Sequence, residues 1–159
     1  MDDNKILKLV YTFFLGLLIA VFVGVGVNTF YPGPKMPDYP TSLSTPVAGD
    51  VSKTDTAAQQ NYDAKYKKYT EAVKPYNRNV SIIILISAIL LLVASIYTEK
   101  KMQIISDGVM LGGLFTLLYS IGRSFASSDS KYVFLVTSVG LVIVMYLGYH
   151  RFVRPHATK

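Results

Sequence analysis

The chain has 159 residues, of which 51% are hydrophobic and only 16% are charged, and its formal net charge is +6. This composition is typical of a membrane protein and argues against a soluble globule, while the scattered basic residues indicate membrane topology rather than nucleic-acid binding. With no cysteine and two histidines, both in the tail, a disulfide framework, a thiolate nucleophile and a Cys or His metal cluster are excluded.

Residues 1–8 carry two lysines before the first apolar run, as the start of a signal peptide would. The run itself, residues 9–30, is about 22 residues long, which is enough to cross lipid and longer than the apolar part of a signal. We therefore predict a cytoplasmic N-terminus followed by a transmembrane helix. Gly16, Ala20 and Gly24 have the small-xxx-small spacing of closely packed helices, although such residues are also simply common in membrane spans.

Residues 31–79 form a long polar segment, which we place outside the cytoplasm. Its first part, the strap of residues 31–50, holds five of the seven prolines and should be extended. The strap is either a docking strip for a partner with an aromatic groove or a semi-rigid tether, and we favour the tether.

An amphipathic helix is predicted over residues 52–76, beginning at a Ser-x-x-Asp pattern at Ser52 and Asp55. Because the strap offers little cover, the exposed stripe of this helix should be buried on another copy or on a partner, and we interpret it as an assembly face. The alternative is a helix lying flat among lipid headgroups. At helical spacing the stripe comprises Tyr62, Tyr66, Tyr69, Val73 and Tyr76.

Pro75 separates this helix from the next apolar run, and we expect a kink or break near residues 73–77 because proline removes a backbone donor. Three more transmembrane helices are predicted at residues 80–97, 102–126 and 132–149, followed by a basic tail at 150–159. The predicted fold is therefore an all-α integral membrane protein. It is a four-helix bundle with a Pro-rich strap and a Tyr-striped helix between its first two spans.

The third run contains a GxxxG pattern, Gly108 and Gly112, which predicts close contact with a neighbouring helix. It also contains two ionisable residues, Asp107 and Arg123, which are 16 positions apart and cannot pair within one helix. Asp107 is either an ion or proton site or a headgroup-level residue paired with Lys100 or Lys101. Arg123 is interpreted as an interfacial anchor with Asp129 or a lipid phosphate as its partner.

Lysine and arginine near the span ends predict the orientation. Seven of them lie on the side that bears the termini, against two on the single short loop of the opposite side, so both termini are expected in the cytoplasm.

We find no residue pattern for enzymatic chemistry: no nucleophile with a base, no phosphate loop and no dinucleotide turn. The sequence therefore predicts a non-enzymatic protein without a cofactor, in contact with membrane lipid. It acts by self-assembly, as a homo-oligomer, or as an accessory or scaffold subunit of a larger membrane-protein partner. The alternative is an oligomeric channel or small transporter lined by the membrane helices.

Overall fold

The computed structural model describes residues 3–40 and 53–153, and within these ranges the regular structure is entirely helical. All four α-helices are long and apolar enough to cross a membrane, so the prediction of an all-helical chain with four such helices is confirmed. In chain order they are α1 (Asp3–Phe30), α2 (Lys53–Thr98), α3 (Gln103–Phe125) and α4 (Ser130–Gly148), and a π-helix, η2 (Tyr149–Val153), follows α4.

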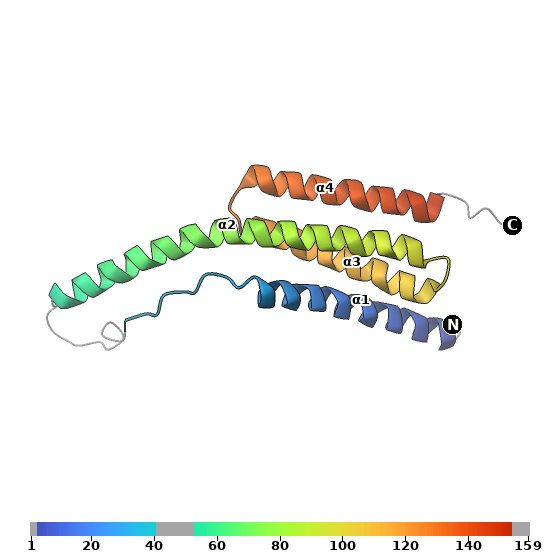
Figure 1. Cartoon of the computed structure of the whole chain (residues 1–159), viewed down its shortest axis with the longest axis horizontal. Coiled ribbons are helices and arrows are strands. Elements are labelled where there is room, and N and C mark those ends of the chain that lie inside the picture. Colours follow the sequence, from blue (N-terminus) through green and yellow to red (C-terminus); the bar gives the residue numbers. More distant parts are fainter. Residues whose placement is uncertain (1–2, 41–52, 154–159) are drawn as a thin grey trace.

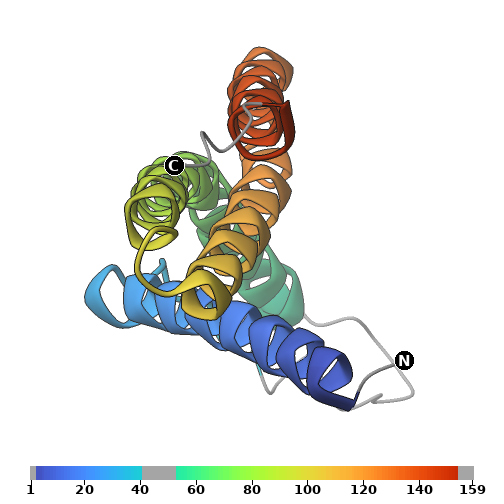
Figure 2. The same cartoon turned by 90° about the vertical axis from the view of Figure 1, so that its right-hand side faces the viewer.

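Helix α3 lies at the centre of the bundle. It packs along α2, and α1 and α4 lie on opposite sides of this pair (Figure 2). Two ends of the bundle can be named (Figure 1). The terminal end holds the start of α1, the α2–α3 turn and η2, whereas the strap end holds the end of α1 and the α3–α4 turn.

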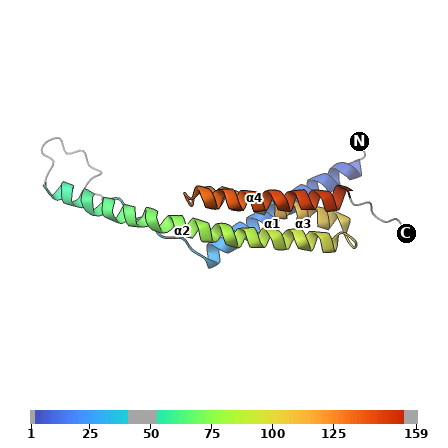
Figure 3. The same cartoon turned by 90° about the horizontal axis from the view of Figure 1, so that it is seen from above.

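Of the predicted kink or break near residues 73–77, the break is wrong, because α2 runs through Pro75 without interruption for 46 residues. Pro75 and Glu71 are both exposed, so the Glu71 carbonyl that lacks a donor is open to water. The helix bows gently, and its first half extends beyond the other helices (Figure 3). We call residues 53–76 the arm. The predicted start at Ser52, strap residues 41–50 and tail residues 154–159 lie outside the described residues.

Small residues at heptad spacing join α2 and α3. Ser81 Oγ donates to the carbonyl of Ser120 at 2.9 Å, and Ser120 Oγ donates back to the carbonyl of Ser81 at 2.8 Å. Two heptads further along α2, Ser106 Oγ donates to the carbonyl of Ser95 at 2.7 Å. These four side chains are fully buried, so α2 and α3 form a tight antiparallel hairpin.

Two adjacent glycines on α3 allow close packing against both α1 and α2. A Cβ added to Gly112 would lie 2.9 Å from Ile19 Cβ of α1 and 3.2 Å from the carbonyl of Gly16. A Cβ on Gly113, the next residue, would lie 2.7 Å from Leu92 Cδ2 of α2. Consecutive helical residues point about 100° apart, so one glycine faces each partner helix.

The remaining predicted packing residues lie along the same α1–α3 contact. Gly108 meets Leu15, and Gly16 meets Gly112. Gly24 is less tightly placed, because a Cβ there would stand 3.5 Å from the Tyr119 ring, an ordinary contact distance.

Gly112→Leu should lower the free energy of unfolding by about 1–3 kcal/mol, since overpacking would force α1 away from α3. The matched control is Gly122→Leu, also on α3, where an added Cβ meets nothing within 4 Å. Thermal unfolding in mild detergent measures both. Equal melting temperatures for the two variants would contradict the close α1–α3 contact.

Candidate functional site

An aromatic cluster stands at the strap end, where the strap leaves α1. Tyr31 stacks on Tyr76 of α2 with ring centroids 5.4 Å apart and planes 6° from parallel. Tyr76 Oη donates to the Tyr31 carbonyl at 3.0 Å, and Asn79 Nδ2 donates to Tyr31 Oη at 3.2 Å. Gly33 allows this approach, since a Cβ there would lie 3.0 Å from the Tyr76 ring. The strap is therefore fixed to α2 at its first residue.

The strap then follows the stripe along the arm. Tyr39 meets Tyr62 edge-on with centroids 5.0 Å apart. An extended strap from Tyr31 to Tyr39 covers about 25 Å at ~3.1 Å per residue. The helix from Tyr62 to Tyr76 covers about 21 Å at 1.5 Å per residue, so the two lengths match.

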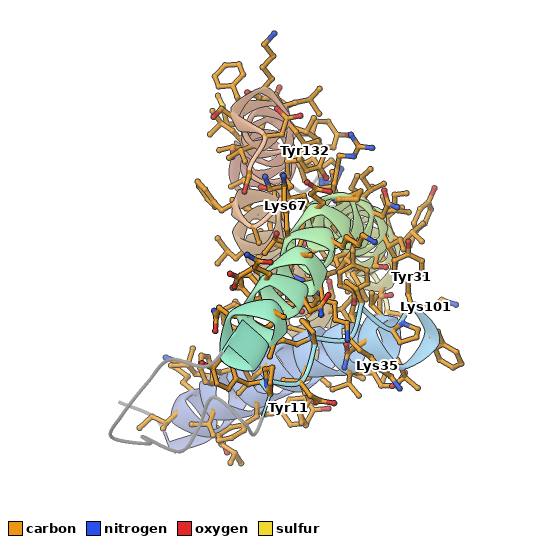
Figure 4. All side chains as sticks on the ribbon, turned by 90° about the vertical axis from the view of Figure 1, so that its left-hand side faces the viewer. Tyr11, Tyr31, Lys35, Lys67, Lys101 and Tyr132 are labelled. Carbon is orange, nitrogen blue, oxygen red and sulfur yellow. The ribbon has the colours of Figure 1, made fainter. Side chains whose placement is uncertain are left out.

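This contact corrects the expectation that the strap gives the stripe little cover. Tyr62, Tyr69, Val73 and Tyr76 are half-buried within the chain. Tyr66 alone of the five stripe residues is exposed, at 42%. The strap thus contacts the stripe at its two end residues, Tyr62 and Tyr76, and leaves Tyr66 exposed. In Figure 4, strap residue Lys35 and arm residue Lys67 lie on opposite sides of the arm.

Arg123, near the end of α3, reaches the same cluster. Its guanidinium carbon lies 5.6 Å from the centroid of the Tyr76 ring, within the range of a cation–π contact. The predicted partner Asp129 is used otherwise: its carboxylate accepts from the backbone N–H groups of Lys131 and Tyr132 and caps α4. Arg123 Nε is buried and has no hydrogen-bond partner among the described residues.

Asp107 lies at the opposite, terminal end and is paired with Arg151 of η2. The suggested partners Lys100 and Lys101 are not the ones found, because α4 runs antiparallel to α3 and brings Arg151 to the start of α3. Glu99 Oε2 stands 3.9 Å from Arg151 Nη1, so two carboxylates flank one guanidinium. As expected, Asp107 and Arg123 occupy opposite ends of α3 and do not meet.

Several residues of these clusters were not predicted from the sequence, among them Tyr31, Gly33 and Arg151, although signals for these three exist. Tyr31 and Gly33 could have been found from the matching lengths of strap and stripe. Arg151 could have been found by placing the last apolar run antiparallel to the third.

Of the predicted packing residues on α1, Ala20 lies half-buried beside Gly24 in a groove between α1 and α3.

The described residues contain no group of three or more His, Asp or Glu side chains placed to hold a metal ion. The chain matches no protein-family model, no curated protein and no solved structure.

The pairing of Asp107 with Arg151 predicts a coupling in a double-mutant cycle. Asp107→Asn and Arg151→Gln should each cost about 1 kcal/mol of stability, and the double variant should cost little more than one of them. Lys100→Gln is the control and should be neutral. Thermal unfolding in detergent measures these four variants and a fifth, the Asp107→Asn/Lys100→Gln double variant. Additive losses at 107 and 151, or coupling of Asp107 to Lys100, would contradict the structure's pairing.

Proposed function

We propose that this chain is a non-enzymatic, multi-pass integral membrane protein that acts by self-assembly or as an accessory or scaffold subunit of a membrane complex. The observation that carries the proposal is the arm of α2, a helical extension beyond the bundle whose stripe is only partly covered by the strap.

Membrane insertion is supported by the outer surface of the bundle. Large apolar side chains face outward on the outer helices, with Phe22 of α1 exposed by 78% and Phe134 of α4 by 75%. In water such a surface would be an aggregation liability, whereas in lipid it is the expected exterior. Along their apolar runs the four helices satisfy their backbone hydrogen bonds internally, as a lipid-crossing segment must, and the Glu71 carbonyl that lacks a donor lies outside these runs, in the arm.

The proposed orientation places the terminal end in the cytoplasm. Lys8, Lys100, Lys101 and Arg151 lie at this end, whereas the short α3–α4 turn and its flanks carry Arg123 and Lys131. The excess of basic residues on short loops favours the cytoplasmic side. Strap and arm would then stand outside the cytoplasm.

The interface on the strap side is marked by polar and aromatic contacts. Tyr132 Oη donates to the Arg78 carbonyl at 3.1 Å, at the level of the Asn79–Tyr31 bond. Tyrosines concentrate at membrane–water boundaries, so α2 would leave lipid near residue 79. The arm of residues 53–76 would then be in water, extending about 36 Å at 1.5 Å per residue.

Tyr66 makes assembly the best-supported role for the arm. A rigid helix with a partly open aromatic stripe offers a preorganised contact surface, and tyrosine binds at low conformational cost. The channel alternative has less support. Buried serines such as Ser81, Ser106 and Ser120 bond to helix carbonyls at the α2–α3 contact, which leaves them little capacity to line a path for ions.

Cysteine labelling tests the orientation, since the native chain has no cysteine. A cysteine at exposed Gln60 on the arm should react with an impermeant thiol reagent in intact cells. A cysteine at exposed Lys100, in the α2–α3 turn, should react only after the membrane is permeabilised. The reverse pattern would overturn the proposed topology.

Tyr66→Glu tests the assembly role. A buried charge should break a protein contact at the stripe, so oligomer size or partner recovery in mild detergent should fall several-fold. The matched control is Ala64→Glu, which places the same side chain at an exposed position on the opposite face of the arm. If both variants keep the parent's oligomer size and every partner, the stripe is not an assembly face. In a separate measurement, ion flux through a uniform oligomer in liposomes would favour the channel alternative.

A further inference from the structure

A groove of about 680 Å³ opens between α1 and α3 on the strap side of their crossing point. Its walls are apolar along most of their length, from Leu17 to Val25 of α1 with Phe115 of α3 opposite. Ala20 and Gly24 line the α1 wall, and their small side chains leave room in the groove. Helices α1 and α3 both run from the terminal end to the strap end (Figure 1). The lining residues, Leu17 to Asn28 of α1 and Phe115 to Arg123 of α3, therefore place the groove between the middle of the bundle and the strap end.

The strap end of the groove is polar. Asn28 lies at the end of the α1 wall, and Tyr119 and Arg123 lie at the end of the α3 wall. The groove therefore has the polarity of a lipid molecule, with an apolar channel and a cationic, hydrogen-bonding mouth. From Leu17 to Asn28 it covers about 16 Å of helix at 1.5 Å per residue, close to one half of a ~30 Å hydrocarbon core.

Arg123 brings an unmatched positive charge to this mouth. A guanidinium has five N–H donors, yet no residue of the described chain accepts a hydrogen bond from Arg123 or pairs with it as a carboxylate. Its contact with Tyr76 is to the ring face, at 5.6 Å, and supplies no acceptor oxygen. Arg123 is half-buried, and only its Nε is a buried atom without a partner, so the rest of the guanidinium is open to an anion from outside the chain, which would offset the cost of a charge beside lipid.

A second copy of the chain is poorly suited to supply that anion. The four apolar runs contain one acidic residue, Asp107, and it is paired with Arg151 at the opposite end of the bundle. At the strap end, the carboxylate of Asp129 already caps α4. A lipid phosphate can supply the anion. Arg123 lies beside the strap-end contacts that mark the proposed membrane interface, where phospholipid headgroups are found. Arginine recognises phosphate through paired N–H donors.

We propose that the α1–α3 groove binds one phospholipid of the strap-side leaflet. The phosphate lies on Arg123, with Asn28 and Tyr119 as further hydrogen-bonding groups, and one acyl chain lies along α1 between Leu17 and Val25. The proposal rests on the membrane insertion proposed above but is independent of the assembly role of the arm.

Lipid add-back to delipidated protein in detergent tests the site. Native mass spectrometry and thermal shift should show saturable binding of phosphatidylglycerol and phosphatidylcholine, and at least tenfold weaker binding of diacylglycerol, which lacks the phosphate. Arg123→Gln should weaken phospholipid binding about tenfold or more, the worth of a charge-assisted hydrogen bond. The control, Lys131→Gln, removes a neighbouring strap-end charge outside the groove and should bind like the parent.

Gly24→Leu provides a second variant if Arg123→Gln folds poorly. A Cβ at residue 24 meets only an ordinary contact with Tyr119, so the helix packing tolerates it while the longer side chain fills the groove. Loss of phospholipid binding in Gly24→Leu supports the proposal. Equal binding of diacylglycerol by the parent, or unchanged phospholipid binding in both groove variants, would overturn it.

Two further measurements distinguish the lipid site from a dimer interface and from a failure of membrane insertion. A dimer that forms in delipidated parent and disappears in Arg123→Gln would assign the groove to a second copy and overturn the lipid site. Resistance to alkaline extraction from membranes tests insertion by itself, so failure of the membrane proposal would be distinguishable from failure of the lipid site.

Discussion

The bundle depends on the close approach of α3 to two helices at once. Lipid is as apolar as leucine, so membrane helices gain little from hydrophobic burial and must gain from dense packing and hydrogen bonds. Gly112 and Gly113 supply the two approaches, one towards Ile19 of α1 and one towards Leu92 of α2. The reciprocal bonds of Ser81 and Ser120 fix the register of the second contact. Without these small residues α3 would be held away from both neighbours.

The geometry of the strap end follows from that packing. Helices α1 and α3 run in the same direction and α2 runs antiparallel to them. The end of α1 therefore lies beside Tyr76 of α2. Tyr31 can then stack on Tyr76, and the strap returns along the arm towards Tyr62. Arg123 comes to the same place from α3 and adds a cation–π contact to the Tyr76 ring. The contacts of Tyr31 and Arg123 with Tyr76 therefore fix the base of the arm, although the arm contains a proline.

Much of the fold could be predicted from the sequence because run length and apolar composition are local properties. The four long apolar helices needed no knowledge of neighbours, and the Gly108–Gly112 spacing pointed to a packing face. What failed depends on tertiary context. Proline would be expected to break an isolated helix. In α2 the free-energy cost of Pro75 is reduced, because the carbonyl that loses its donor is exposed to water and the side chains of Tyr76 and Asn77 form tertiary hydrogen bonds. The partner of Asp107 depended on the antiparallel register of α4.

The central claim is that α2 is one continuous helix whose arm stands rigidly beyond the bundle. Spin labels on cysteines at Gln60 and Ala94, both exposed, measure this directly by pulsed electron resonance in lipid. A continuous helix predicts one narrow distance distribution near about 50 Å, at 1.5 Å for each of the roughly 34 steps between the two labels. A broad distribution, or one centred well below about 40 Å, would show that the helix breaks or hinges at Pro75 and would contradict a rigid arm.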